Sequence, residues 1–295
     1  MTPDTTLSSL QKSPEADMIE LHNLTKQFEH FTAVDSISLR IETGEFFGLL
    51  GPNGAGKTTT IGMLSTLLLP TSGEIRIDGE LLTRKRQDLK RKVSVITQEY
   101  SMRQDMDMDE IMEYQGRLYF MPVKQIRART EELFAFAGLT EHRRKTIRKL
   151  SGGMKRKLMV CRALLTEPEI LLLDEPTAGM DAISRRQMWS LLRQLNEKGL
   201  TILLTTHYIE EAQSLCGRVA LMNGGRLNEI DTPAHLIENL GAYAVDELLD
   251  DGIHSRYFHE RSQAIACLSG LTGQCTLRDT TLEDVFVEQV GKRLS

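Results

Sequence analysis

The stretch from Gly51 to Thr59, GPNGAGKTT, constrains the fold of this chain more than any other feature. It fits the pattern G-x-x-x-x-G-K-[ST] and follows an apolar run from Phe46 to Leu50. Glycines in such a loop let backbone N–H groups curve around a phosphate chain, and the helix that follows points the positive end of its dipole at the same place. The apolar stretch Thr59–Leu69, ended by Pro70, predicts that helix. We therefore expect a nucleotide site here rather than a merely glycine-rich turn.

Each polar group of this loop has an expected role. Lys57 would reach the β- and γ-phosphates, and the hydroxyl of Thr58 would bind Mg²⁺. The residues predicted to bind nucleotide within the loop are Gly51, Pro52, Asn53, Gly54, Ala55, Gly56, Lys57, Thr58 and Thr59.

Composition excludes several classes of protein. The net charge of −5, from 36 basic and 41 acidic residues, argues against a nucleic-acid-binding surface. No apolar run is long enough to span a bilayer, and the N-terminus lacks the regions of a secretory signal. We expect a soluble, cytoplasmic protein with reduced cysteines and a polar, mobile tail over residues 1–17.

The pattern along the chain alternates strands and helices. Half-buried strands are expected at Met18–Leu24 and Ala33–Ile41, and buried strands at Phe46–Leu50, Ile170–Leu173 and Thr201–Thr205. Further strands are expected at Glu74–Ile77, Val219–Met222 and Arg226–Ile230, the last two as a hairpin. Residues 88–165 are mainly helical in pattern, and further helices are expected at Arg185–Lys198 and Ile209–Leu215.

Two carboxylates close the apolar run that begins at Ile170. Asp174 would hold Mg²⁺ through water, and Glu175 would orient or deprotonate the attacking water. The alternative is an ordinary strand that ends in a solvated acid pair, but the phosphate loop upstream favours the functional interpretation.

A second glycine motif, Leu150 to Met154 (LSGGM), opens a basic and apolar helix. Alone it could be a helix N-cap followed by flexible glycines. In order, the phosphate loop, Gln98, this motif, Asp174-Glu175 and His207 resemble the ATP-binding cassette (ABC) family. The resemblance runs from about Met18 to Pro233. Met154 stands where many members have Gln, a departure familiar in the subgroup of drug-resistance exporters.

The resemblance implies roles for residues outside the phosphate loop. Gln98 would contact Mg²⁺ and water, and its segment would contact a membrane partner. His207 would be the switch histidine on the γ-phosphate, and Phe28 would stack on adenine, although a core role for Phe28 is the alternative. The implied catalytic residues are Glu175, His207, Gln98 and Lys57. The implied metal ligands are Thr58, Gln98 and Asp174. The implied nucleotide-binding residues outside the loop are Phe28, Ser151, Gly152, Gly153 and Asp181.

The implied fold is α/β, a P-loop NTPase (RecA-like) core with an antiparallel β subdomain and an inserted α-helical subdomain. The cassette would span residues 18–233, with the helical subdomain at about 99–165 and a small C-terminal appendage at 234–295. In the appendage, Leu282–Phe286 is expected to be a helix that covers a core rather than a regulatory element.

The resemblance also implies a function and partners. With ATP and Mg²⁺, two copies, or one copy and a second cassette protein, would pair head to tail and drive a separately encoded permease as an exporter ATPase. The chain would lie on the cytoplasmic face of the plasma membrane. The alternatives are a soluble cassette protein acting on ribosomes or DNA and an importer ATPase. The methionines between 102 and 112 are expected to give flexible packing against a permease rather than a soft-metal site.

Overall fold

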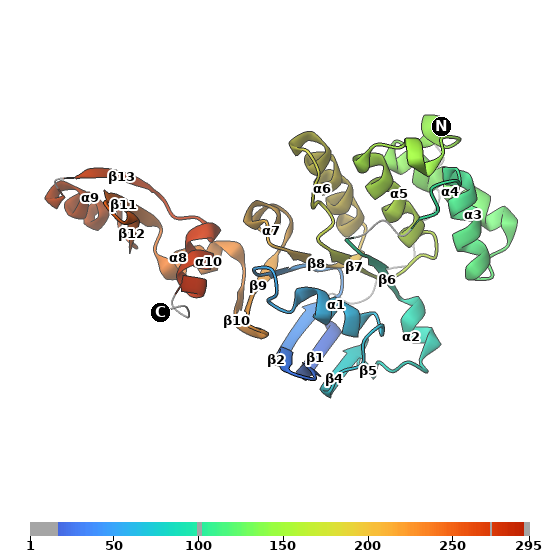
Figure 1. Cartoon of the computed structure of the whole chain (residues 1–295), viewed down its shortest axis with the longest axis horizontal. Coiled ribbons are helices and arrows are strands. Elements are labelled where there is room, and N and C mark those ends of the chain that lie inside the picture. Colours follow the sequence, from blue (N-terminus) through green and yellow to red (C-terminus); the bar gives the residue numbers. More distant parts are fainter. Residues whose placement is uncertain (1–16, 99–101, 272, 292–295) are drawn as a thin grey trace.

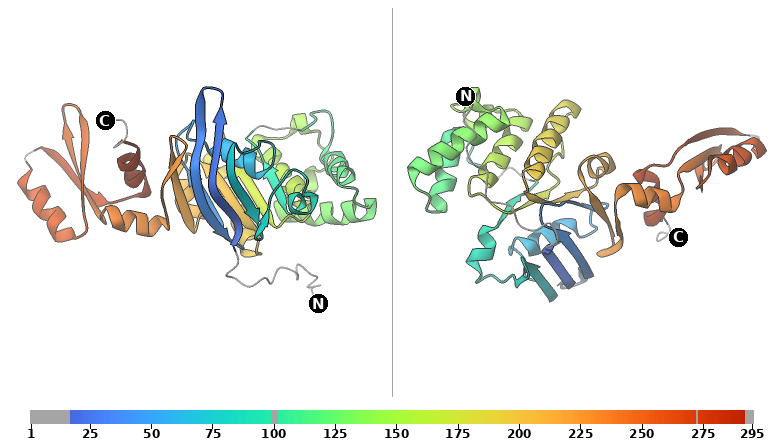
Figure 2. Two further views of the ribbon diagram at one scale, coloured as in Figure 1. Left: turned by 90° about the horizontal axis from the view of Figure 1, so that it is seen from below. Right: turned by 180° about the vertical axis from the view of Figure 1, so that it is seen from behind.

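The computed structural model describes residues 17–98, 102–271 and 273–291 (Figure 1). The expected tail, residues 1–17, lies outside this part of the chain except for Asp17. The predicted α/β architecture is confirmed. A mainly parallel sheet lies at the centre, with an antiparallel sheet below it in Figure 1, a group of helices on one side and a small C-terminal unit on the other (Figures 1 and 2).

The central sheet has six strands in the order β10-β9-β3-β8-β7-β6. They are β3 (Phe46–Leu50), β6 (Val93–Ile96), β7 (Ile170–Asp174), β8 (Thr201–Thr206), β9 (Arg218–Asn223) and β10 (Arg226–Asp231). Neighbours pair in parallel except β10, which is antiparallel to β9. Every residue of β3, β7 and β8 is buried, as in apolar strands covered on both faces. Parallel pairing brings their carboxyl ends to one edge, where Asp174 is paired with Thr205.

The two faces of this sheet belong to two apolar clusters. Along β7, Leu171 and Leu173 join one cluster, whereas Ile170 and Leu172 join the other. Helices α5 (Gly152–Leu164), α6 (Ala182–Glu197) and α7 (Ile209–Leu215) cover the first face, and α1 (Lys57–Leu64) covers the second (Figure 1).

An antiparallel sheet packs on the α1 side, in the order β2-β1-β4-β5. It consists of β1 (Asp17–Phe28), β2 (Phe31–Glu42), β4 (Ser72–Ile77) and β5 (Glu80–Leu81). Along β2, Ile37, Leu39 and Ile41 are buried and the residues between them are exposed. This is the alternation expected of a strand with one face on a core.

Helix α1 is shorter than the sequence predicts. It ends at Leu64 rather than at Leu69, because Thr66 adopts a φ of 60° and the chain turns back. The N–H of Leu68 then donates to the carbonyl of Gly62 at 2.9 Å. A Cβ on Gly62 would lie 2.9 Å from the Leu68 side chain. The missing side chain of Gly62 therefore makes room for Leu68 against the helix.

The helical group comprises α2 (Gln87–Arg91), α3 (Met108–Leu118), α4 (Val123–Ala137), the short 3₁₀ turns η1 (Thr140–His142) and η2 (Ile147–Lys149), and α5. The sequence predicted that the methionines between 102 and 112 pack against a permease, but the structure buries most of them inside the chain. Met102, Met108 and Met112 are buried in the larger apolar cluster, and Met106 packs against it. Met fills irregular gaps well, and here it joins the helices to one another.

The C-terminal unit begins with α8 (Pro233–Leu240) and contains a three-stranded antiparallel sheet, ordered β12-β11-β13. Its other elements are β11 (Tyr243–Leu249), β12 (Gly252–Phe258), α9 (Arg261–Gly270), β13 (Gln274–Asp279) and α10 (Leu282–Gly291). The sheet and α9 project away from the rest of the chain, and α10 returns to pack on α8 (Figures 1 and 2). Leu282 and Val285 are buried in the larger cluster, so this helix covers a core as predicted.

Within the part of the chain that the structure describes, no helix combines the length and the apolar character needed to cross a membrane.

Candidate nucleotide-binding site

The phosphate loop joins β3 to α1, and two of its glycines have no room for a side chain. Gly56 is the N-cap of α1 with a φ of 108°, and a Cβ there would lie 2.4 Å from the carbonyl oxygen of Ala33. A Cβ on Gly51 would lie 2.3 Å from the carbonyl oxygen of Met222. Since such contacts are too short for real Cβ atoms, only glycine fits. The strand, loop and helix predicted from the sequence are all present.

Lys57 is folded back over this loop. Its Nζ donates to the carbonyls of Gly51 at 2.8 Å and Pro52 at 3.0 Å, and it lies 3.6 Å from Oε1 of Glu175. The side chain is only 4% exposed. Burial lowers the pKa of Lys57, and the nearby carboxylates of Glu175 and Asp174 oppose that shift. The Lys57 ammonium could donate to phosphate oxygens in place of these two carbonyls.

Oxygen donors gather beside the start of α1. The Thr58 hydroxyl donates to Oδ1 of Asp174 at 3.2 Å, and the Thr205 hydroxyl donates to the same oxygen at 2.6 Å. The exposed Gln98, two residues after β6, lines the same cleft. Hydroxyl, carboxylate and amide oxygens are the ligands that Mg²⁺ prefers. This donor set fits a hard divalent cation.

Glu175 and His207 form a contact at the ends of β7 and β8. Oε1 of Glu175 lies 3.1 Å from Nδ1 of His207. Glu175 has a φ of 48°, in the left-handed region that a residue with a side chain rarely adopts. Its N–H donates to the carbonyl of Thr205 at 3.0 Å. This backbone turn directs the carboxylate toward Lys57 and His207 rather than along the strand.

A cleft of about 500 Å³ connects these groups. It is lined by Phe31, Ala33, Asn53, Gly54, Gly56, Lys57, Thr58, Thr59, Gln98, Glu175, Ala178, His207 and Tyr208. Most of the predicted loop residues and Gln98, Glu175 and His207 therefore meet in one place. Asp174 joins them through Thr58, whereas Gly51, Pro52 and Ala55 supply the backbone behind the cleft.

A second group of predicted residues lies at the starts of α5 and α6 and does not line this cleft. Ser151 is the N-cap of α5, and its hydroxyl accepts from the N–H of Met154 at 3.3 Å; Gly152 and Gly153 form the first turn of that helix. Asp181 is the N-cap of α6 and accepts from the N–H of Ser184 at 2.9 Å. Ser151, Gly152 and Asp181 are exposed, so these residues form a second surface of the same chain.

Phe28 lies at the end of β1, and its side chain is 40% exposed, which excludes the core role. Its ring stacks on Phe31, with centroids 5.4 Å apart and planes at 24°. Phe31, rather than Phe28, lines the cleft. Phe31 was not among the residues predicted from the sequence, although Phe28 and Phe31 flank a two-residue turn and this pattern could have indicated both. Thr205 was also missed, because its contact with Asp174 depends on which strands are neighbours.

The sequence of residues 34–178 matches the family described as ABC transporter. Over 240 residues the chain is 36% identical to the linearmycin resistance ATP-binding protein LnrL of Bacillus subtilis, covering 81% of this chain and 77% of that protein. Over 298 residues it is 34% identical to the Nod factor export ATP-binding protein I of Cupriavidus metallidurans, covering 94% of this chain and 98% of that protein.

A solved structure shares the fold. A bacterial ABC transporter cassette, solved as a dimer, is similar with a TM-score of 0.66 and 28% sequence identity. The similarity covers 73% of this chain and 98% of that one.

Proposed function

The chain belongs to the ABC transporter family, whose cassettes bind and hydrolyse ATP, and on this premise we propose that it is the ATPase subunit of an exporter. It would drive a separately encoded membrane permease from the cytoplasmic face of the membrane. The observation that carries the proposal is the cleft in which the phosphate loop meets Gln98, Glu175 and His207. The names of the relatives, which refer to antibiotic resistance and to Nod factor export, support the exporter type.

The triphosphate of ATP would lie in the phosphate loop. The loop N–H groups and the N-terminus of α1 would bind its oxygens. Lys57 would release the carbonyls of Gly51 and Pro52 and donate to the β- and γ-phosphates, which restores a charged partner to a buried ammonium. Phe31, and Phe28 stacked on it, would offer an aromatic surface to the base.

Thr58, Asp174 and Gln98 would hold Mg²⁺ between them and the phosphates. The bound cation would neutralise negative charge on the phosphates. The Thr205 hydroxyl donates to one oxygen of Asp174 at 2.6 Å. This hydrogen bond would hold the orientation of the carboxylate when Mg²⁺ binds.

Glu175 would orient and deprotonate the attacking water. His207, whose Nδ1 lies 3.1 Å from this carboxylate, would hold the γ-phosphate and respond to its loss. Two residues that directly follow adjacent strands would thus contact the water and the phosphate that it attacks.

Two copies of the chain would complete each site. Ser151, Gly152 and Gly153 lie at a helix N-terminus outside the cleft of their own chain, where N–H groups can bind a phosphate. In a head-to-tail pair they would close over the γ-phosphate of the partner. Asp181, at the start of α6, would lie beside them in the interface. Pairing would depend on ATP because the nucleotide lies between the two surfaces.

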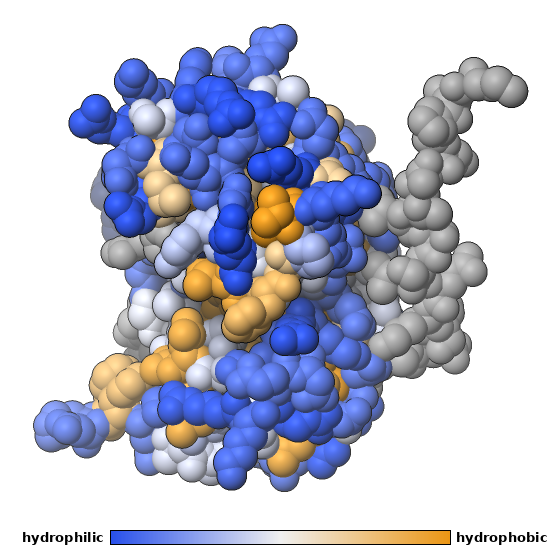
Figure 3. Space-filling view, turned by 90° about the vertical axis from the view of Figure 1, so that its right-hand side faces the viewer, coloured by the Kyte–Doolittle hydropathy of each residue, from blue (hydrophilic) through white to orange (hydrophobic). Residues whose placement is uncertain are grey.

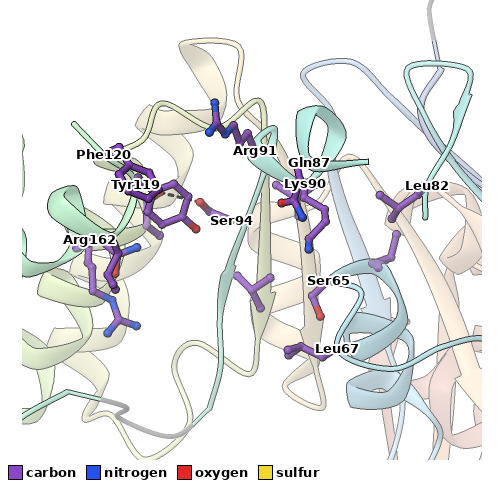
Figure 4. Close-up of a pocket in the computed structure, with 16 residues that line it drawn as sticks. Ser65, Leu67, Leu82, Gln87, Lys90, Arg91, Ser94, Tyr119, Phe120 and Arg162 are labelled. Atoms are coloured by element: carbon purple, nitrogen blue, oxygen red, sulfur yellow. Dashed lines mark hydrogen bonds between the residues drawn. The ribbon is translucent and has the colours of Figure 1, made fainter. Parts of the chain in front are cut away.

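A groove on the side of α2 and α3 would receive the permease. It has a volume of about 510 Å³ and is lined in part by Leu67, Leu118 and Phe120, which are 68%, 56% and 89% exposed. Figure 3 shows apolar side chains gathered in a hollow on this side, and Figure 4 shows the side chains that line the groove. Val93 and Val95 of β6 also line it. Because β6 leads to Gln98, a displacement of β6 by the permease would also move Gln98 in the nucleotide cleft.

Co-purification tests the permease. The tagged chain is recovered from detergent-solubilised membranes, and we expect an integral membrane protein to accompany it. Phe120→Ser should abolish this recovery while leaving ATP hydrolysis by the isolated chain intact. Ile253→Ser, which removes a side chain 69% exposed on β12, is the control and should retain the partner. Recovery of ribosomes or DNA in place of a membrane protein would contradict the proposal, and an accompanying substrate-binding protein would indicate an importer.

A further inference from the structure

The residue that follows His207 is a tyrosine whose ring packs on the imidazole. The centroids of the Tyr208 and His207 rings lie 4.1 Å apart, and their planes are tilted by 37°. Successive residues of a strand point to opposite sides, so this contact depends on the chain leaving β8 after Thr206. Tyr208 is the N-cap of α7, and its N–H donates to the Thr206 hydroxyl at 3.0 Å. This hydrogen bond holds the turn that brings the two rings together.

A guanidinium from a different helix contacts the same tyrosine ring. Arg185 lies near the start of α6, and its Cζ is 5.4 Å from the centroid of the Tyr208 ring. Its Nη1 lies 4.0 Å from Oε2 of Glu210. A cation is attracted to the face of an aromatic ring, more strongly where water is partly excluded, and both side chains are half-buried. Arg185 therefore restricts the positions that the Tyr208 ring can take.

The orientation of the His207 ring matters for the proposed reaction. Its Nδ1 lies 3.1 Å from Oε1 of Glu175, and the side chain is 32% exposed in the cleft. Rotation of the imidazole about its outer bond would turn Nδ1 away from Glu175. Such outer torsions to a planar ring are broad and weakly restricted by themselves. Packing of the Tyr208 ring against the imidazole opposes this rotation.

We propose that Tyr208 is a positioning residue that keeps the imidazole of His207 in the orientation in which Nδ1 meets Glu175, and that Arg185 holds the Tyr208 ring against it. The inference rests on the role proposed for His207. Without the tyrosine ring, ATP still binds the phosphate loop, but His207 adopts the productive orientation for less of the time. Turnover therefore slows while the affinity for ATP is kept.

Steady-state ATP hydrolysis by the full-length chain tests the kinetic consequence. Tyr208→Leu keeps an apolar side chain but removes the ring, and should lower kcat about five-fold, as expected for loss of one aromatic pair. The KM for ATP should change by less than about two-fold, since the ground-state contacts remain. Tyr208→Phe keeps the ring and should retain kcat within about two-fold.

Arginine variants test the second contact. Arg185→Gln should lower kcat about two-fold to three-fold, the loss expected for one cation–π contact at a partly exposed site. Arg193→Gln is the matched control, because Arg193 also joins α6 to α7, by donating from Nη2 to the carbonyl of Ser214 at 2.7 Å. That contact does not involve Tyr208, so this variant should keep the parental kcat.

The ring contact is also measured without any reaction. The ring resonances of His207 are followed by NMR in histidine-labelled chain without ATP, and are assigned among the seven histidines by their loss in His207→Gln. An aromatic ring displaces the resonances of protons that lie over its face. Tyr208→Leu should therefore shift the His207 signals clearly, whereas Tyr208→Phe should leave them close to their parental positions.

The outcomes separate this inference from the role of His207 itself. If His207→Ala hydrolyses ATP at the parental rate, the proposed role of His207 is wrong. If His207→Ala is impaired but Tyr208→Leu is not, the positioning role is wrong. Adding Tyr208→Leu to His207→Ala should lower kcat no further, because both act through one imidazole; a further five-fold loss would overturn the inference. A raised KM with unchanged kcat, or unshifted His207 signals in Tyr208→Leu, would overturn it as well.

Discussion

At the scale of single residues, the cleft holds a buried positive charge whose hydrogen bonds go to neutral carbonyls. Lys57 is buried, its pKa is lowered by that burial, and its donors are used on Gly51 and Pro52. Glu175 lies 3.6 Å away and offsets part of the cost. A phosphate chain would replace neutral carbonyls with charged acceptors, which form the stronger hydrogen bonds.

Replacing Lys57 tests this directly. Lys57→Ala should weaken ATP binding about ten-fold or more, since a charged hydrogen bond contributes about 1.5–3 kcal/mol. Titration with a fluorescent ATP analogue measures the change. Lys124→Ala, at an exposed position on α4, should bind as the wild type does. An unchanged affinity in Lys57→Ala would exclude this loop as the phosphate site.

Glu211 is a second buried charge, behind the cleft. It is fully buried on α7 and accepts from the Thr177 hydroxyl at 2.8 Å and from Nε1 of Trp189 at 3.0 Å. Burial raises the pKa of Glu211 above its usual value, although hydrogen bonds from Thr206, Thr177 and Trp189 oppose the shift. The folded chain therefore holds this proton to a higher pH than the unfolded chain does.

The raised pKa of Glu211 makes the stability of the folded chain depend on pH. The stabilisation from the raised pKa is fully present below the unfolded value near 4.5 and is lost as the pH rises through the folded value. Glu211→Gln lacks this titration and keeps a carbonyl acceptor. The free energy of unfolding of the variant minus that of the wild type should therefore increase with pH from about 4.5 upward. Urea denaturation across this range measures it, and a difference that does not change with pH would contradict the buried-carboxylate account.

At the scale of elements, the sequence predicts the type of each segment, helix or strand, more accurately than it predicts the segment's ends. Continuous apolar runs identified β3, β7 and β8, because strands covered on both faces leave no other pattern. The predicted end of α1 was wrong, because the chain turns at Thr66 and brings Leu68 back over Gly62. Apolar periodicity does not indicate such a turn. The contact of Thr205 with Asp174 could not be predicted either, because strand order is a property of the sheet.

The site residues likewise divide into those that the sequence predicts and those that it does not. Residue types in a fixed order identified Lys57, Glu175 and His207, whose chemistry is local to each motif. The hydrogen bond from Nη2 of Arg156 to the carbonyl of Gln98 joins residues 58 positions apart, and no periodic pattern in either segment predicts it.

Helix α10 packs on α8 and α7 and is expected to anchor the C-terminal unit to the cassette. Leu282 is fully buried in the larger cluster, so Leu282→Ala should lower the free energy of unfolding by about 2–5 kcal/mol. Val287→Ala, at a position 59% exposed on the same helix, should change it by less than about 0.5 kcal/mol. Chemical denaturation compares the two variants. Equal and small effects would mean that α10 does not anchor the C-terminal unit to the cassette.

At the scale of the whole molecule, each chain would carry two half-sites of the proposed head-to-tail pair. One is the cleft of the phosphate loop, and the other is the exposed turn at Ser151, which that cleft does not include. In this proposal a single chain can bind ATP but would enclose only part of it. The energy of ATP binding is therefore expected to appear as association of two chains, which the permease in its groove would convert into movement.

The most direct test of this account is the molar mass of the Glu175→Gln chain in solution, measured by light scattering with and without ATP. We predict the mass of one chain without nucleotide and of two chains with ATP, with ATP hydrolysis slowed about 100-fold or more. Adding Ser151→Glu, which sets a negative charge against the phosphate, should leave one chain even with ATP. A Glu175→Gln chain that keeps the mass of one chain at saturating ATP would contradict the shared site.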